Sequence, residues 1–132
     1  MESALSGVGT NVGKDSLLWY QRTIDVPVKR TGKRILLHFG AVDWRINVYL
    51  NGNRVGTHEG GYDPFTVDIT GSLRKGARQL LTVSVWDPTD DGPQPHGKQV
   101  AKSNGIWYTS VTGIWQTVWM ESVPDTYIAS TR

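Results

Sequence analysis

The sequence contains no cysteine, only two phenylalanines and no long hydrophobic run. Without cysteine there is neither a disulfide framework nor a thiolate zinc site. No apolar stretch approaches the roughly 18 residues of a membrane-spanning helix, and residues 1–7 lack the basic and apolar regions of a signal peptide. Lys plus Arg exceed Asp plus Glu by only 14 to 12, too little to indicate nucleic-acid binding. We therefore expect neither nucleic acid nor a membrane as a partner, and the compartment stays open.

What the chain does have is glycine, tryptophan and short alternating runs. It holds 15 Gly and 6 Trp in 132 residues, and apolar and polar residues alternate as in half-buried strands rather than at helical spacing. Asn51-Gly52 between two such runs predicts a two-residue hairpin turn with positive φ at both residues. A helical turn is expected within residues 72–76. The runs that predict strands are 18–26 (ended by Pro27), 35–39, 46–50, 54–58, 65–69, 80–86, 106–121 and 127–128.

This pattern predicts an all-β fold. Eight or nine short strands with frequent turns and no helix between them are typical of an antiparallel β-sandwich. The length fits one domain, and no linker divides the chain. Residues 87–105, rich in Pro and Gly, form a long predicted loop, and loops of this length are usually functional or mobile.

The sequence offers little for metal or covalent chemistry. Residues 87–92 begin like a calcium loop, but the twelfth position holds Lys98 where a bidentate Glu is needed. A structural calcium of another geometry stays possible without support from a motif, and no cofactor is expected. No Gly-x-Ser-x-Gly element is present, and nothing aims Asp90 and Asp91 at one substrate, so no catalytic residue is assigned.

The aromatic residues are the strongest functional candidates. Flat rings in partly open positions bind the apolar faces of sugars. Trp107 and Tyr108 follow the long loop, and Trp44 precedes a strand; these three are the sugar-facing candidates, with core packing as the alternative for the tryptophans. Arg22 shares the apolar face of its strand, so we expect a carboxylate partner for it. The remaining tryptophans are expected in the core: Trp19, Trp86, Trp115 and Trp119.

Several motifs, in their order and spacing, resemble the N-terminal sugar-binding domain of glycoside hydrolase family 2. That family includes β-galactosidases, β-glucuronidases and β-mannosidases, and the resemblance covers residues 5–128. It implies a galactose-binding-like jelly roll. The motifs that carry it are Trp19-Tyr20-Gln21-Arg22, the segments 34–43, 48–52 and 58–65, Asp68-Ile69-Thr70, and Thr112-Gly113-Ile114-Trp115-Gln116.

The resemblance also implies what the chain does not carry. In the family the catalytic Glu residues belong to a barrel that follows this domain, so residues 1–132 are expected to be a single non-catalytic domain excised from a larger glycoside hydrolase. Asp15 matches a sugar-contacting Asn of the family, and Trp107 stands where members place a sugar-contacting Asp. Gln94, Lys98 and Gln99 lie on the same long loop and are expected to add polar contacts.

Three functions stay open at this stage. The chain is interpreted first as a carbohydrate-binding accessory domain that offers a shallow aromatic site to β-linked oligosaccharides or polysaccharides. The alternative is a structural module that packs on the other domains of the parent glycosidase and binds no free sugar. An enzyme acting alone is the third. Heat released on sugar binding in calorimetry separates the carbohydrate-binding domain from the structural module. Hydrolysis by the purified chain would indicate an enzyme acting alone.

Overall fold

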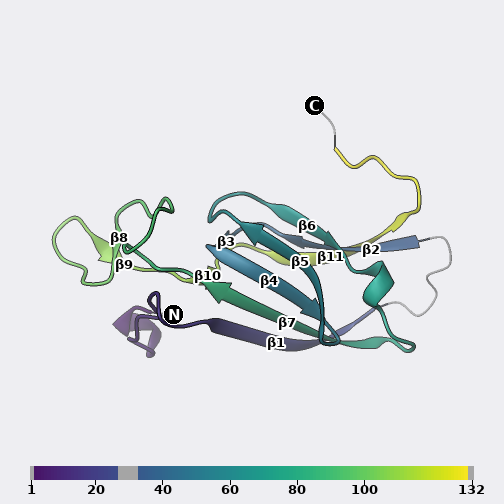
Figure 1. Cartoon of the computed structure of the whole chain (residues 1–132), viewed down its shortest axis with the longest axis horizontal. Helices are drawn as coiled ribbons and strands as arrows, with labels where there is room; N and C mark the ends of the chain where they lie inside the picture. Colours follow the sequence, from purple (N-terminus) through teal and green to yellow (C-terminus); the bar gives the residue numbers. More distant parts are fainter. Residues whose placement is uncertain (1, 27–32, 131–132) are drawn as a thin grey trace.

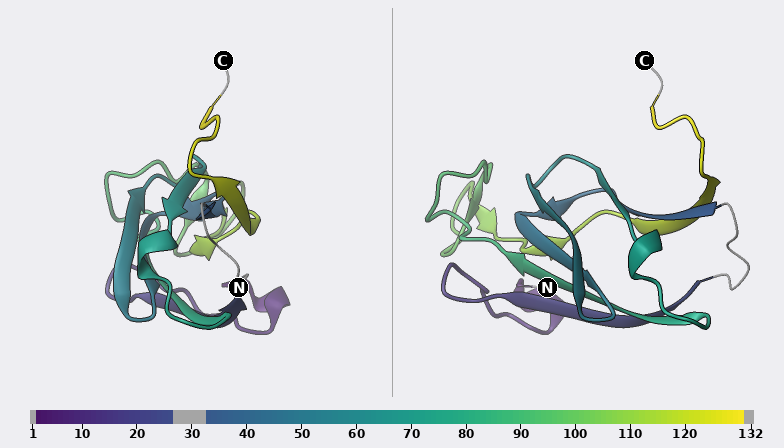
Figure 2. Two further views of the ribbon diagram at one scale, coloured as in Figure 1. Left: turned by 90° about the vertical axis from the view of Figure 1, so that its right-hand side faces the viewer. Right: turned by 45° about the vertical axis from the view of Figure 1, so that its right-hand side comes forward.

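The structure is a computed structural model that describes residues 2–26 and 33–130. In this part of the chain, two antiparallel sheets face each other (Figure 1, Figure 2). One has the strand order β1-β7-β4-β5 and the other β11-β2-β6, and β3 pairs with β10. The strands of the two sheets are β1 (Leu18–Asp25), β2 (Lys33–Phe39), β4 (Arg45–Leu50), β5 (Asn53–Glu59), β6 (Phe65–Asp68), β7 (Arg78–Trp86) and β11 (Val118–Pro124).

The core lies between these sheets because alternate residues of each strand point inward. Phe39, Ile46 and Val85 are fully buried, and Phe39 stacks on Phe65 with ring centroids 4.7 Å apart. The predicted hairpin is confirmed: Asn51 and Gly52 have φ of 53° and 88°, and they join β4 to β5. The predicted all-β sandwich is thereby confirmed, while the jelly-roll connectivity stays a prediction.

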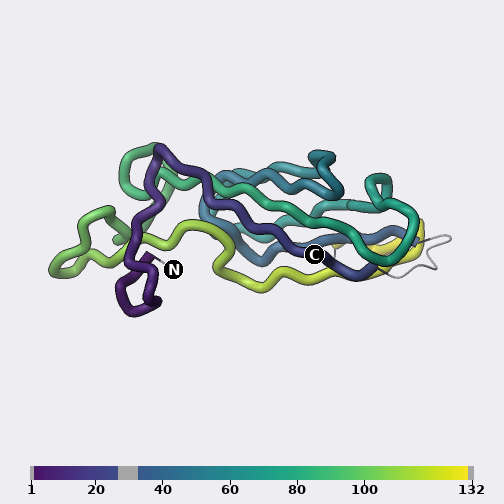
Figure 3. Tube along the Cα trace, turned by 90° about the horizontal axis from the view of Figure 1, so that it is seen from below, coloured from purple at the N-terminus to yellow at the C-terminus, as the bar shows by residue number. Residues whose placement is uncertain are grey.

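The long loop and the N-terminal segment lie at one end of the sandwich (Figure 1, Figure 3). The short strands β8 (Gln99–Val100) and β9 (Tyr108–Thr109) pair in parallel there, and β10 (Gly113–Ile114) pairs with β3 (Val42–Asp43). Two 3-10 turns complete the described chain, η1 (Ala4–Ser6) and η2 (Thr70–Ser72). Neither of these helices could cross a membrane.

Several local expectations are wrong. The helical turn is η2, which ends at Ser72 rather than beginning there. No strand forms at residues 127–128, since β11 ends at Pro124 and Ile128 is 81% exposed. The stretch 106–121 is broken into β9, β10 and the start of β11. Pro27, the expected end of the first strand, lies outside the described residues.

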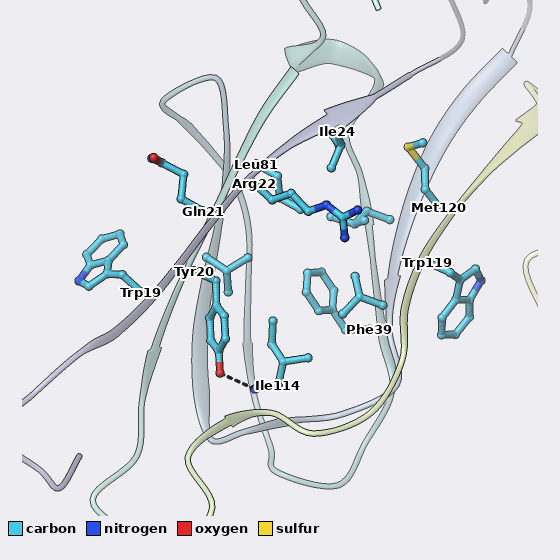
Figure 4. A pocket seen from close by; sticks show the side chains of 13 residues that line it. Trp19, Tyr20, Gln21, Arg22, Ile24, Phe39, Leu81, Ile114, Trp119 and Met120 are labelled. Atoms are coloured by element: carbon cyan, nitrogen blue, oxygen red, sulfur yellow. Dashed lines mark hydrogen bonds between the residues drawn. The ribbon is translucent and has the colours of Figure 1, made fainter. Parts of the chain in front are cut away.

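The placement of the tryptophans also differs from expectation. Trp19, Trp115 and Trp119, predicted to be in the core, are 56%, 43% and 47% exposed, and Trp86 is half-buried. On β1 and β11 the neighbours of Trp19 and Trp119 face inward instead (Figure 4), because adjacent residues of a strand point to opposite faces. Arg22 is exposed and forms no ion pair with any residue of 2–26 or 33–130, so its expected carboxylate partner is absent there.

Candidate functional site

Trp107 and Tyr108 present two partly open rings at the loop end of the sandwich. They are 43% and 58% exposed. The Trp107 amide donates to the Asn104 carbonyl at 2.9 Å, and the Tyr108 amide donates to the Lys98 carbonyl at 3.0 Å. These turn and strand bonds fix the backbone beneath both rings, so Tyr108 is presented by β9 and Trp107 by the hydrogen-bonded turn before it.

Trp44 lies between β3 and β4 and contacts Trp86 at the end of β7. Their ring centroids are 6.1 Å apart with the planes tilted by 56°. The Arg45 guanidinium carbon lies 5.3 Å from the centroid of one ring and 5.0 Å from that of the other, a cation–π arrangement. The Trp86 indole N–H donates to the Lys14 carbonyl at 2.7 Å. Trp44 is therefore half-buried in a structured aromatic cluster.

Asp15 is exposed in the turn before β1. Its neighbour Lys14 forms an ion pair with Asp91 of the long loop. This contact and the bond from Trp86 to Lys14 hold the turn against the same end of the sandwich as Trp44. The structure thus places the turn that carries Asp15 near the long loop, and Asp15 is exposed there.

The three loop residues predicted to make polar contacts behave differently. Lys98 is exposed. Gln99 is half-buried and tied in place, because its side-chain oxygen accepts from the Val111 amide at 2.6 Å. Gln94 is buried, and its amide donates to the Thr89 carbonyl at 2.7 Å. Gln94 therefore packs inside the loop and does not reach a surface ligand, so only Lys98 keeps a free polar end.

A buried acidic network, which the sequence did not reveal, lies beneath this end of the sandwich. Glu2, Asp43 and Asp87 are each no more than 5% exposed. Glu2 accepts from the Thr112 amide at 2.6 Å and from the Ser110 hydroxyl at 3.0 Å. The Thr112 hydroxyl also lies 3.1 Å from an Asp87 carboxylate oxygen. The network ties the N-terminal segment, the end of β7 and the approach to β10 together.

Burial has an electrostatic consequence in this network. Burial first, and then the charge of Asp87, raise the pKa of Asp43 to about 6. Burial also raises the pKa of Asp87, against the hydrogen bond that it accepts from the Thr89 amide. One Asp43 oxygen has no hydrogen-bond partner in the described chain. These carboxyl groups therefore cost folding free energy when charged.

The three aspartates of the long loop point to separate partners. Asp87 is held by the amide of Thr89, Asp90 accepts from the Ala101 amide at 3.3 Å, and Asp91 pairs with Lys14. Within residues 2–26 and 33–130, no group of three or more His, Asp or Glu side chains is placed to hold a metal ion.

Sequence reasoning missed a second aromatic surface. Tyr62, Trp115 and Trp119 line a groove of about 640 Å³ together with Gln116. Tyr62 and Trp115 meet edge to face at 6.0 Å, and the Trp115 indole donates to the Gly61 carbonyl at 2.7 Å. The available signal was strand alternation, which puts Trp119 on the face opposite its inward neighbours.

With this geometry established, comparisons place the chain among known proteins. Residues 9–124 match the family model described as glycosyl hydrolases family 2, sugar binding domain. A β-galactosidase of Thermoanaerobacter pseudethanolicus is 34% identical over 111 residues, which are 83% of this chain and 14% of that protein. A β-glucuronidase of Felis catus is 28% identical over 144 residues, covering 89% of this chain and 22% of that protein.

A solved structure of a β-glucuronidase agrees with the family match and with these two relatives. The crystal structure of Bacteroides uniformis β-glucuronidase superimposes with a TM-score of 0.64 and 30% identity over 83% of this chain and 12% of that chain. This chain thus spans between about an eighth and a fifth of the length of these relatives. The chain belongs to the sugar-binding domain family of the family 2 glycosyl hydrolases.

Proposed function

We propose that this chain is a non-catalytic carbohydrate-binding domain of a β-glycosidase and that it holds β-linked sugars at the loop end of its sandwich. Its binding surface is the aromatic rim, defined as Trp44, Trp107 and Tyr108, with Asp15 and Lys98 as polar neighbours. The observation that carries the proposal is the adjacent pair of half-open rings at Trp107 and Tyr108, one just before and one within the hydrogen-bonded strand β9. Rigid rings of this kind suit the C–H faces of a sugar.

The position of the carboxyl groups supports a non-catalytic role. A glycosidase needs two carboxyl groups about 5–9 Å apart that reach the substrate. Glu2, Asp43 and Asp87 are buried, and chain donors occupy most of their oxygens. A substrate would have to displace these hydrogen bonds to reach any of these three acids. The domain therefore binds or positions, while the chemistry of a parent enzyme is assigned to other domains.

The expected affinity is weak. A shallow rim buries little ligand surface, so the dissociation constant is expected near 1 mM, about 4 kcal/mol of binding free energy. The three grooves of about 720, 500 and 640 Å³ are lined by other residues, which fits a surface platform at the rim rather than an enclosing pocket. Ring stacking is expected to supply most of that energy.

Isothermal calorimetry tests the proposal on the purified chain. The ligands are a β-1,4-linked galactan tetrasaccharide and methyl β-glucuronide, each to 10 mM or about ten times the expected dissociation constant. We expect saturable heat for at least one, loss of that heat in Trp107→Ala, and retention in Trp19→Ala. Trp19 is the matched control because it is similarly exposed but stacks on Tyr49 on the outer sheet face. Absence of heat from the folded chain would refute the proposal.

A second candidate is a docking module for other domains of a glycosidase. The observation that favours it is the groove of Tyr62, Trp115 and Trp119, since contiguous exposed aromatic side chains often mark protein interfaces. Under this alternative Trp107→Ala changes association or solubility and no sugar heat appears in any variant. The same calorimetry therefore separates the two functions.

A further inference from the structure

Two of the five asparagines in the chain precede a glycine, at Asn51-Gly52 and Asn104-Gly105. An asparagine in this position is open to an intramolecular reaction, in which the backbone nitrogen of the next residue attacks the side-chain amide carbon. Glycine favours the attack because it has no side chain to shield that nitrogen and its backbone adopts many conformations. The two pairs share this covalent chemistry, so a difference in their reactivity must come from the fold.

The fold locks the side chain of Asn51 in the hairpin between β4 and β5. Its amide donates to the Gln79 side-chain oxygen at 2.8 Å and to the Ser72 carbonyl at 3.1 Å, and its oxygen accepts from the Leu80 amide at 3.0 Å. The residue is half-buried. To reach the Gly52 nitrogen, the side chain would have to break these three hydrogen bonds. The hairpin is therefore protected, although its sequence is reactive.

Asn104 lacks this protection. Asn104 and Gly105 are both exposed in the segment between β8 and β9, at the loop end of the sandwich (Figure 1). Within residues 2–26 and 33–130, the Asn104 side chain makes no hydrogen bond; its backbone carbonyl accepts from the Trp107 amide. Gly105 has φ of 55°, and an atom at its Cβ position would meet nothing within 4 Å. The Asn104 side chain is thus free to turn toward the Gly105 nitrogen.

We propose that Asn104 is a site of spontaneous deamidation. The Gly105 nitrogen loses its proton to hydroxide, forms a bond to the Asn104 Cγ and expels the side-chain amide group as ammonia, which leaves a cyclic succinimide. A water molecule then opens one of the two imide C–N bonds. Opening at Cγ yields aspartate, whereas opening at the backbone carbonyl carbon yields isoaspartate, in which the main chain runs through the former side chain. In sum, water is consumed and ammonia is released, with no change in oxidation state.

The isoaspartate product changes the turn that carries Trp107. The Asn104 carbonyl that accepts from the Trp107 amide at 2.9 Å becomes part of a free carboxylate, and an extra methylene enters the backbone shortly before β9. Either product also adds a negative charge to this end of the sandwich. Deamidation therefore alters the support of a ring in the aromatic rim. Its effect on sugar affinity rests on the proposed function, whereas the reaction itself does not.

Incubation of the purified chain at pH 8 and 37 °C, followed by tryptic mapping with mass spectrometry, tests the reaction. Trypsin places Asn51 in the peptide 46–54 and Asn104 in the peptide 103–132, so the two conversions are measured separately in one sample. We expect Asn104 to convert roughly tenfold or more faster than Asn51, whose three hydrogen bonds must break first. In the urea-unfolded chain the two rates are expected to become similar. Asn104→Gln is the matched variant, because glutamine forms the corresponding larger ring much more slowly.

Equal rates at the two asparagines in the folded chain overturn the proposal, as does an unchanged Asn104 over a period in which the unfolded chain converts. The effect on the turn is measured on the isolated isoaspartate form, in which hydrogen exchange of the Trp107 amide is expected to rise severalfold. Asn104→Asp adds the charge without lengthening the backbone and is expected to keep the slower exchange. Calorimetry with the galactan tetrasaccharide is expected to show weaker binding by the isoaspartate form. Absence of heat from the unmodified chain would refute sugar binding at the rim, while the conversion rates still decide this proposal.

Discussion

Asp43 is a residue whose charge the fold tolerates poorly. It is buried, one of its oxygens has no partner, and its pKa is raised to about 6 by burial and by Asp87. Its weak contact to the Gln99 amide, at 3.5 Å, only partly offsets this cost. The native state therefore binds a proton at Asp43 more readily than the unfolded chain does, whose carboxyl titrates near 3.8.

Asp43→Asn is expected to stabilise the fold at neutral pH. In the native state Asp43 is protonated below pH 6 or so, whereas in the unfolded chain it is protonated only below pH 3.8. The stability of the native state therefore falls as the pH rises from 3.8 to about 6. Above pH 6 the wild type carries the full cost of the charge, which the amide removes. Urea unfolding at pH 7.5 and pH 4 is expected to show a variant more stable at pH 7.5, with the difference shrinking toward pH 4.

Asp68 provides a control of opposite sign. Burial opposes ionisation there, but hydrogen bonds from Thr70 and the Arg34 charge prevail and lower its pKa. The stability that the charged Asp68 carboxylate adds to the native state is present above pH 3.8 and is lost as the pH falls through the lowered pKa of Asp68. Asp68→Asn is thus expected to destabilise the chain at pH 7.5 and to converge with the wild type in acid. A destabilised Asp43→Asn at pH 7.5 would contradict this account of the buried network.

The tryptophans show what residue type alone cannot predict. Their size suggested the core, yet Trp19 and Trp119 are about half exposed because Tyr20, Val118 and Met120 occupy the inward positions. Alternation along the strand decided their direction, and it was visible in the sequence. The buried acidic network could not be predicted from the sequence, since Glu2 and Thr112 are 110 residues apart and meet only in the folded chain.

At the scale of elements, β10 depends on a glycine. Gly113 has φ of 105°, where L side chains are strained, and an added Cβ would overlap the Tyr20 hydroxyl. That hydroxyl accepts the Ile114 amide at 3.3 Å. Gly113→Ala is therefore expected to destabilise the fold by about 2 kcal/mol or more in chemical denaturation, because it displaces Tyr20 as well as straining the backbone.

Gly71 is the matched control for this substitution. It lies in η2, its φ is outside the left-handed region, and an added Cβ there meets nothing within 4 Å. Gly71→Ala is expected to change stability by only about 0.5 kcal/mol. Similar losses in both variants would mean that the contact with Tyr20 is not what β10 requires.

Element prediction from the sequence succeeded where local chemistry decides the structure. The Asn51-Gly52 hairpin and the strands around it follow from positive φ and period-two burial. The short pairs β8–β9 and β3–β10 have only two residues in each strand, too few for any periodicity. They exist because distant segments meet, and a single sequence carries no signal for that.

At the scale of the whole molecule, the fold buries Glu2, Asp43 and Asp87, and the exposed loop acids Asp90 and Asp91 have separate partners. The purified chain is therefore expected to release no measurable nitrophenol from nitrophenyl β-galactoside or β-glucuronide. A Glu2→Gln variant, altered in the buried network, serves to separate intrinsic activity from a contaminant: hydrolysis that disappears in this variant would contradict the non-catalytic role.

The candidate site was predicted in part. Trp107, Tyr108 and Lys98 are exposed or half-open at one end of the sandwich, as their position in or after the long loop indicated, and Asp15, singled out by the family resemblance, is exposed as well. Gln94 points inward because its side-chain amide donates a hydrogen bond to the buried Thr89 carbonyl, which needs a donor. The spacing of residues in the sequence does not reveal this need. Whether the rim binds sugar stays a prediction for experiment.

The most direct test of the central claim follows the six tryptophan indole N–H signals by proton–nitrogen NMR while a β-linked sugar is added to the intact chain. The account predicts saturable shifts at Trp107 and Trp44 at millimolar sugar, with the signals of Trp19 and Trp119 unchanged. It is contradicted if no signal moves while the fold stays intact, or if Trp19 and Trp119 move and Trp107 does not.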